Sequence, residues 1–78
     1  MSGWQRDGEA LVRDLKFDDF AQAMAYVNRV ADLAEEVNHH PDILVHGWNH
    51  VRLTLTTRAA GRLTDNDYDM ARRIDELP

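Results

Sequence analysis

A single proline most constrains how this chain can fold. Apolar residues recur every three or four positions from Phe20 to Val37, which is typical of an amphipathic helix of about five turns. Pro41 follows shortly afterwards and cannot continue a helix. Because proline also disfavours helical dihedrals in the residue before it, we expect His40 in extended geometry, whereas His39 can still close the last helical turn. The sequence therefore predicts a helix that ends abruptly at two adjacent histidines.

This histidine pair, His39 and His40, is the main candidate for a functional site. Neighbouring side chains diverge by about 100° in a helix and face opposite sides in a strand, so a break between helix and strand is what allows both rings to face one concavity. Glu35, Glu36 and Asp42 flank the pair. Nearby carboxylates and a helix C-terminus favour imidazolium and keep the histidine pKa, ordinarily about 6.5, useful for proton transfer. From spacing alone, a pair that simply caps a helix end is the favoured interpretation.

Alternating side chains predict strands on both sides of this helix. Asp7-Gly8 is a tight-turn pair, and the partial alternation over residues 9–17 predicts a short hairpin whose second strand is the longer. Arg13 stands among the apolar positions of that strand, where a charge is unexpected. Residues 43–45 read as a short apolar strand, and residues 51–56 alternate between apolar and polar side chains after a turn.

The end of the chain completes an α+β pattern. Thr64, followed by Asp67, predicts the start of a last helix. The elements then follow in the order β-β-α-β-β-α within a single domain, residues 1–78. One face of the strand at 51–56 is apolar and the other is rich in threonine, as expected of an antiparallel sheet covered by helices on one side only. The other face is left for solvent or for a second subunit.

Composition excludes several classes of function. A chain of 78 residues buries a modest core, so help from oligomerisation is expected. It contains no cysteine, which removes disulfides, thiolate catalysis and zinc–sulfur sites. The net charge of -5 argues against a general nucleic-acid binder. No apolar run approaches the ~20 residues of a membrane span and the N-terminus lacks signal-peptide features, so we expect a soluble, cytoplasmic protein with no membrane partner.

A metal site is the first competing hypothesis. His46 and His50 have the spacing that would place them on one face of a helix, but Gly47 and Asn49 indicate a turn between strands instead. Both histidines are therefore expected at the surface or rim of the sheet, and no metal site is predicted.

Several motifs occur together along nearly the whole chain. They are Phe17–Phe20, Ala34-Glu35, His39–Asp42, Trp48–Val51, Leu53–Thr57, Gly61–Asp67 and Ala71–Asp75. Together they resemble the pterin-4a-carbinolamine dehydratases, also known as dimerisation cofactors of a homeodomain transcription factor. The resemblance implies an α+β fold, in which a four-stranded antiparallel sheet carries helices on one face, and assembly as homodimers or homotetramers. It also implies that no metal or organic cofactor is needed.

The resemblance further implies a reaction. A 4a-hydroxytetrahydropterin loses water to give quinonoid dihydropterin, which recycles the cofactor of aromatic amino-acid hydroxylases. Expelling hydroxide from C4a requires a proton donor, and forming the double bond requires removal of the N5 proton, which suits histidine near neutral pH. By family position His39 and His40 are the catalytic pair, His39 as the acid–base residue and His40 as the one that binds or orients the pterin. Glu35 and Asp67 are implied as supporting pocket residues that set the imidazole charge.

Arg58 is a departure from the family pattern, which usually has a third active-site histidine at this position. A guanidinium, with a pKa above about 12, cannot act as a base at neutral pH, but it can stabilise a departing oxyanion or hold the pterin with fixed donors. The expected function is therefore a pterin dehydratase that Arg58 slows or tunes differently. The alternative is a non-catalytic, protein-binding member, since relatives are known as a transcription-factor dimerisation partner and as an assembly factor for Rubisco.

Overall fold

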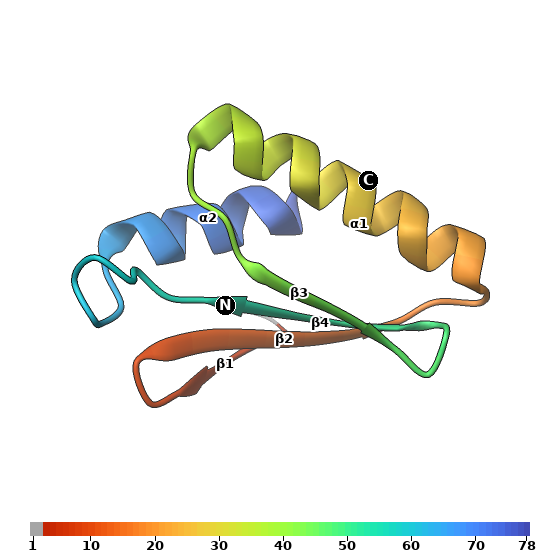
Figure 1. The fold of residues 1–78 in the computed structure, drawn as a ribbon, viewed down its shortest axis with the longest axis horizontal. Helices are drawn as coiled ribbons and strands as arrows, with labels where there is room; N and C mark the ends of the chain where they lie inside the picture. The colour runs from red at the N-terminus through yellow and green to blue at the C-terminus, as the bar shows by residue number, and fades with distance from the viewer. Residues whose placement is uncertain (1–2) are drawn as a thin grey trace.

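The structure, a computed structural model, describes residues 3–78 as a four-stranded antiparallel sheet with both helices on one face (Figure 1). In chain order the elements are β1 (Trp4–Asp7), β2 (Ala10–Lys16), α1 (Phe20–Val37), β3 (Asp42–His46), β4 (His50–Leu55) and α2 (Asp65–Asp75). The predicted α+β class and the β-β-α-β-β-α order are thereby confirmed. Neither helix in this part of the chain is long and apolar enough to cross a membrane.

The strand order β1-β2-β4-β3 places β2 and β4 at the centre and leaves β1 and β3 at the edges. Leu11 of β2 lies opposite Leu55 of β4, and Leu15 lies opposite Val51. Because directly opposed residues share one face of a sheet, this register places the apolar positions of both central strands together, towards the helices. The polar positions between them form the outer face.

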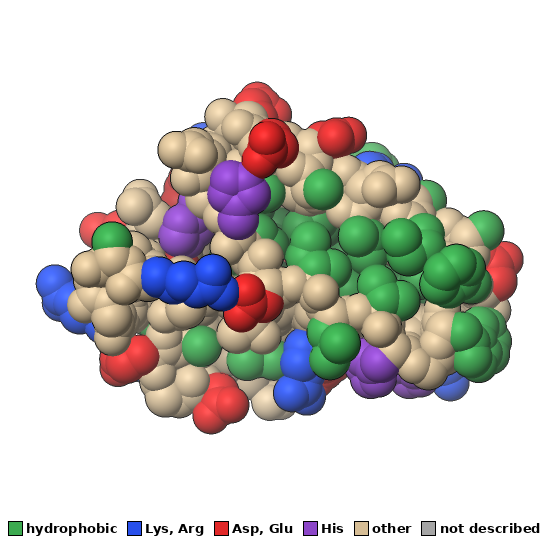
Figure 2. All heavy atoms as spheres, in the orientation of Figure 1, with side chains coloured by type: hydrophobic (Ala, Val, Ile, Leu, Met, Phe, Trp, Pro, Cys, Tyr) green, Lys and Arg blue, Asp and Glu red, His purple; other side chains and the backbone are tan. Residues whose placement is uncertain are grey.

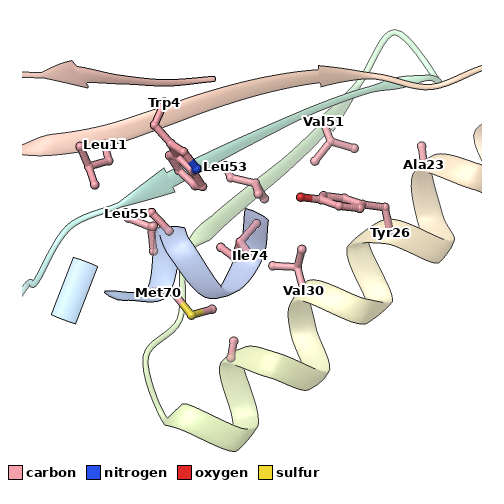
Figure 3. Packing of buried hydrophobic residues seen from close by; sticks show 12 residues of the cluster. Trp4, Leu11, Ala23, Tyr26, Val30, Val51, Leu53, Leu55, Met70 and Ile74 are labelled. Carbon is pink, nitrogen blue, oxygen red and sulfur yellow. The ribbon is translucent and has the colours of Figure 1, made fainter. Parts of the chain in front are cut away.

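The core lies between the inner face of the sheet and the two helices (Figure 3). Its buried members are Trp4, Leu11, Ala23, Tyr26, Val30, Ala34, Val51, Leu53, Leu55, Met70, Ala71 and Ile74. The small side chains of Ala23 and Ala34 allow α1 to approach the sheet closely, and burial raises the pKa of the Tyr26 phenol above its ordinary value. Trp4 of β1 packs into this core.

Arg13 is accommodated on the helix-facing side of β2 by a partner at the end of α2. Its guanidinium pairs with the carboxylate of Asp75, which also accepts a hydrogen bond of 2.8 Å from Nε1 of Trp4. Trp4 and Arg13 are themselves opposite each other in β1 and β2. The charge that interrupts the apolar pattern of β2 therefore joins the β1–β2 hairpin to α2 at the rim of the core.

The end of α1 is set by Asn38 rather than by a histidine. Asn38 adopts left-handed dihedrals (φ 54°, ψ 42°) and its amide donates to the carbonyl of Ala34. The amide of His39 donates to the same carbonyl at 3.2 Å, so His39 contributes its backbone to closing the last turn, as predicted. The chain nevertheless reverses one residue before the pair, which releases both imidazoles from the helix.

The turn between β3 and β4 is held against the segment that precedes α1. The amide of Phe17 donates to the carbonyl of Asn49 at 2.8 Å, and the side-chain amide of Asn49 donates back to the carbonyl of Phe17 at 3.0 Å. Asn49 is buried, whereas its neighbour Trp48 is 61% exposed. Asp19 caps the start of α1, because its carboxylate accepts a hydrogen bond from the backbone amide of Gln22 at 2.8 Å.

Candidate active site

A hollow of about 270 Å³ lies where the end of α1 and the start of β3 meet the segment that follows β4. Its lining residues are Asn38, His39, His40, Thr56, Thr57, Arg58 and Ala59. Figure 2 shows histidine side chains gathered with acidic and basic ones near the end of α1. The structure therefore brings His39, His40 and Arg58, which the sequence singled out, to one pocket.

His39 is held by a buried carboxylate. Its Nε2 lies 2.6 Å from Oδ1 of Asp67, whose side chain is completely buried while that of His39 is 19% exposed. Asp67 stands in the first turn of α2, so this contact joins the segment after α1 to the start of the second helix. The imidazole is thus anchored on one side and faces the pocket on the other.

Three donors surround the Asp67 carboxylate and offset its burial. Oδ2 accepts hydrogen bonds from Oγ1 of Thr57 at 2.8 Å and from the backbone amide of Thr64 at 3.0 Å, while Oδ1 faces His39. A buried carboxylate is costly unless it is hydrogen-bonded, and these partners supply what water would otherwise provide. The bond from the Thr64 amide also caps α2, so Asp67 serves the helix and the histidine together.

This arrangement determines which nitrogen of His39 carries the proton in the neutral ring. An ionised carboxylate only accepts hydrogen bonds, so Nε2 donates to Asp67 and Nδ1 is left as the basic nitrogen. A histidine oriented in this way can accept a proton and give it back, which is the requirement for acid–base catalysis.

The partner of His40 is Glu35, which lies in the last turn of α1. Nε2 of His40 contacts Oε2 of Glu35, and the two side chains are exposed, at 54% and 77%. An ion pair in this setting contributes little to stability, because water and salt screen it. His40 is therefore less firmly held than His39 and is free to reorient towards a ligand in the pocket.

Arg58 lies at the same pocket and contacts an acid that opens β3. Its Nη2 meets Oδ1 of Asp42, and the two side chains are 73% and 62% exposed. A guanidinium stays protonated at neutral pH, so this position supplies fixed positive charge and N–H donors rather than a titrating base. Asp42 was recognised in the sequence only as an acid that flanks the histidines.

The five predicted site residues thus fall into two groups. His39, His40 and Arg58 line the pocket, whereas Glu35 and Asp67 lie behind the histidines and contact the imidazoles. The sequence analysis assigned no role to Thr57, whose hydroxyl donates to the Asp67 carboxylate. The only signal for Thr57 was its place in the Leu53–Thr57 motif.

His46 and His50 lie away from the pocket on the outer face of the sheet. They are opposite each other in β3 and β4, at the turn that the sequence predicted, and their rings stack with centroids 5.3 Å apart. Within residues 3–78, no group of three or more histidine, cysteine or acidic side chains is arranged to hold a metal ion.

Comparison with known sequences points to one family. Residues 1–77 match the family described as Pterin 4 alpha carbinolamine dehydratase. A protein of Thermomicrobium roseum, provisionally named as a pterin-4-alpha-carbinolamine dehydratase, is 55% identical over 75 residues, which cover 96% of this chain and 80% of the relative. A protein of Mycobacterium tuberculosis with the same provisional name is 48% identical over 77 residues, which cover 99% of this chain and 81% of the relative.

Solved structures agree with the sequence comparison. The fold is similar to that of a transcriptional coactivator/pterin dehydratase from Brucella melitensis, with a TM-score of 0.87 and 36% identity over 95% of this chain and 80% of that one. It is also similar to a pterin dehydratase-like protein identified as a RuBisCO assembly factor in the alpha-carboxysome, with a TM-score of 0.72 and 29% identity over 92% and 82% of the two chains. On these matches, the chain belongs to the pterin-4a-carbinolamine dehydratase family.

Proposed function

We propose that this protein dehydrates 4a-hydroxytetrahydropterins to quinonoid dihydropterins. The observation that carries the proposal is the His39–Asp67 pair, in which a partly exposed imidazole at the wall of a pocket is oriented by a fully buried carboxylate. Membership of the pterin dehydratase family supplies the class of substrate. A paired histidine of this kind suits a reaction in which one proton is removed and one is delivered.

The proton transfers can be assigned to His39 with the atoms in balance. Nδ1 of the neutral ring takes the proton from N5 of the substrate while the bond between C4a and the hydroxyl oxygen breaks and a double bond forms between C4a and N5. The imidazolium, stabilised by Asp67, then returns the proton to the departing hydroxide, which leaves as water. His40 and Arg58 hold the pterin from the other sides of the pocket.

The test measures dehydration of freshly generated 4a-hydroxytetrahydropterin, followed by the absorbance of the quinonoid product. We expect the wild type to accelerate the step and His39→Gln to lose about 10²-fold or more in rate, the usual contribution of a positioned acid–base group. Glutamine can place an amide N–H where Nε2 of the imidazole donates to Asp67, so the contact with the carboxylate is preserved while the titrating ring is removed.

His46→Gln is the matched control, because it makes the same substitution at a histidine on the outer face of the sheet. Its rate should equal that of the wild type. A wild-type rate no greater than the uncatalysed reaction would refute the dehydratase function and leave the fold as described.

A second candidate function is protein binding without catalysis. Two observations favour it: arginine stands where a third histidine is usual in the family, and a structural relative is identified as a RuBisCO assembly factor. In this case the chain would act as a protein-binding assembly or dimerisation factor, and the pocket residues would not affect its activity. The rate measurement above separates the two candidates.

We also propose that the chain assembles as a homodimer or homotetramer. The edge strand β3 presents unpaired backbone groups, which can pair with the same strand of another copy. Beside it, Figure 2 shows a continuous hydrophobic area over α1 and β3. Large apolar side chains are also exposed at Phe20 (54%) and Trp48 (61%), and a second copy of the chain could cover them. The cytoplasmic location expected from the sequence stays a prediction, which cell fractionation would check.

A further inference from the structure

The ion pair between Arg58 and Asp42 connects the two segments that form the pocket. Asp42 opens β3 directly after the His39–Pro41 segment, and it lies opposite Thr54 of β4 in the sheet. Arg58 belongs to the turn that follows β4. The pair therefore joins the pocket wall that carries Arg58 to the strand that follows the two histidines, and each end of it is attached to regular or tightly turned backbone.

The backbone that carries Arg58 is well defined. Thr57 and Arg62 form an isolated bridge, and the amide of Gly61 donates to the carbonyl of Thr57 at 2.9 Å. Gly61 has a φ of 67°, a left-handed conformation that favours glycine. The Cα of Arg58 is thus fixed, but its long side chain is 73% exposed and would sample many rotamers without a partner.

A second arginine pair in the same protein shows what is distinctive about this contact. On the outer face, Arg52 makes a bidentate contact with Asp14, in which Nε donates to Oδ1 at 2.7 Å and Nη2 donates to Oδ2 at 3.0 Å. Arg58 meets Asp42 through Nη2 alone. Within residues 3–78 its side chain makes no other hydrogen bond, so Nε and the second terminal nitrogen keep their N–H donors for a ligand.

The acids around the pocket are each engaged with a different base. Asp67 faces His39, Glu35 faces His40 and Asp42 faces Arg58. Among residues 3–78, Asp42 is thus the one carboxylate that accepts a hydrogen bond from the Arg58 guanidinium.

We infer that Asp42 is a positioning residue, whose carboxylate favours the rotamers of Arg58 that keep the guanidinium at the pocket as a hydrogen-bond donor to the bound pterin. The inference rests on the dehydratase function proposed above and assigns a task to the position at which this chain departs from its family. Arg58 in this role binds and orients the pterin ring, whose carbonyl oxygen and ring nitrogens accept hydrogen bonds, and leaves proton transfer to His39.

The experiment compares Asp42→Asn with Asp14→Asn. Both aspartates pair with an arginine and are similarly exposed, at 62% and 59%, but Asp14 lies on the outer face of the sheet. Exposed pairs contribute little to folding, so both variants should fold. Binding of dihydrobiopterin is measured at equilibrium, and kcat and KM are measured for dehydration.

We expect Asp42→Asn to weaken dihydrobiopterin binding and raise KM by about fivefold while kcat changes by less than about twofold, because one ordered charge contact is lost. Asp14→Asn should change neither value. In an Arg58→Ala background Asp42→Asn should have no further effect, since a positioning residue acts only through the group it positions.

Two results would overturn the inference. One is an active wild type with unaltered binding and KM in Asp42→Asn. The other is an effect of Asp42→Asn that persists at full size when Arg58 is alanine. If the wild type neither binds dihydrobiopterin nor accelerates dehydration, the proposed function itself fails and this role of Arg58 fails with it.

Discussion

At the scale of single residues, Asp67 is held on all sides by the atoms that surround its carboxylate. Its carboxylate has no exposed surface and lies among His39, Thr57 and the amide of Thr64. A network of this kind is stabilising only while every member is satisfied, because a buried charge that loses a donor retains its full desolvation cost. Substitutions around Asp67 should therefore affect both the orientation of His39 and the stability of the fold.

Thr57→Val tests this network directly. Valine matches threonine in shape but removes the hydroxyl that donates to Oδ2 of Asp67, so we expect a loss of about 1–3 kcal/mol in the free energy of unfolding. Dehydration should also slow, because His39 loses its fixed orientation. Urea denaturation and the absorbance assay measure the two effects.

Thr56→Val is the control for that variant. The Thr56 hydroxyl donates to the carbonyl of Glu9 at an exposed site, where water can replace it. Equal destabilisation by the two variants would contradict the special role of the buried network.

At the scale of secondary-structure elements, the end of α1 decides where the histidines point. The left-handed residue Asn38 turns the chain before the pair, and asparagine tolerates this conformation better than other residues with a Cβ, apart from aspartate. Pro41 then prevents the chain from resuming a helix. The two residues together produce the short extended segment on which His39 and His40 lie.

Asn38→Ala should destabilise the protein by about 1 kcal/mol, because alanine is strained at positive φ. Asn38→Gly should be neutral or stabilising, since glycine adopts this conformation freely. Thermal unfolding followed by circular dichroism distinguishes the two variants. A glycine variant less stable than the alanine variant would mean that the asparagine side chain, not its backbone conformation, is what matters.

The parts of the fold that the sequence predicted are those determined locally. Helical periodicity, the cap at Thr64 and the turn residues depend on neighbours a few positions away, and each was found where expected. The pairs Arg58–Asp42 and Arg13–Asp75 join residues 16 and 62 positions apart. They depend on strand register and on how α2 docks, which no local pattern encodes. Arg13 therefore seemed out of place in the sequence, and Asp42 was recognised only as an acid beside the histidines, not as the partner of Arg58.

At the scale of the whole molecule, the fold is two layers with only one face of the sheet covered (Figure 1). The outer face carries the Asp14–Arg52 pair and the stacked His46 and His50, while Leu44 is 54% exposed. The hydrophobic area at the side, over α1 and β3, is the surface from which we expect assembly to proceed.

Phe20→Glu tests assembly without disturbing the fold. Phe20 is the first residue of α1 and is exposed, and a carboxylate at a helix N-terminus is favourable. We expect sedimentation equilibrium to show a dimer or tetramer for the wild type and a shift towards monomer for the variant. Gln5→Glu adds the same charge on the opposite edge strand, β1, and should leave the assembly intact. A monomeric wild type would contradict the proposed oligomer.

Asp67 contacts both the start of α2 and the imidazole of His39, so the motions of the helix and of the histidine are linked. The carboxylate of Asp67 both caps the first turn of α2 and holds the imidazole, so fraying of that turn releases His39 in the same event. Protection of the Thr64 amide against hydrogen exchange therefore reports on the readiness of the site for reaction. A ligand that binds only the ordered imidazole would slow that exchange from across the pocket, with no contact to the helix.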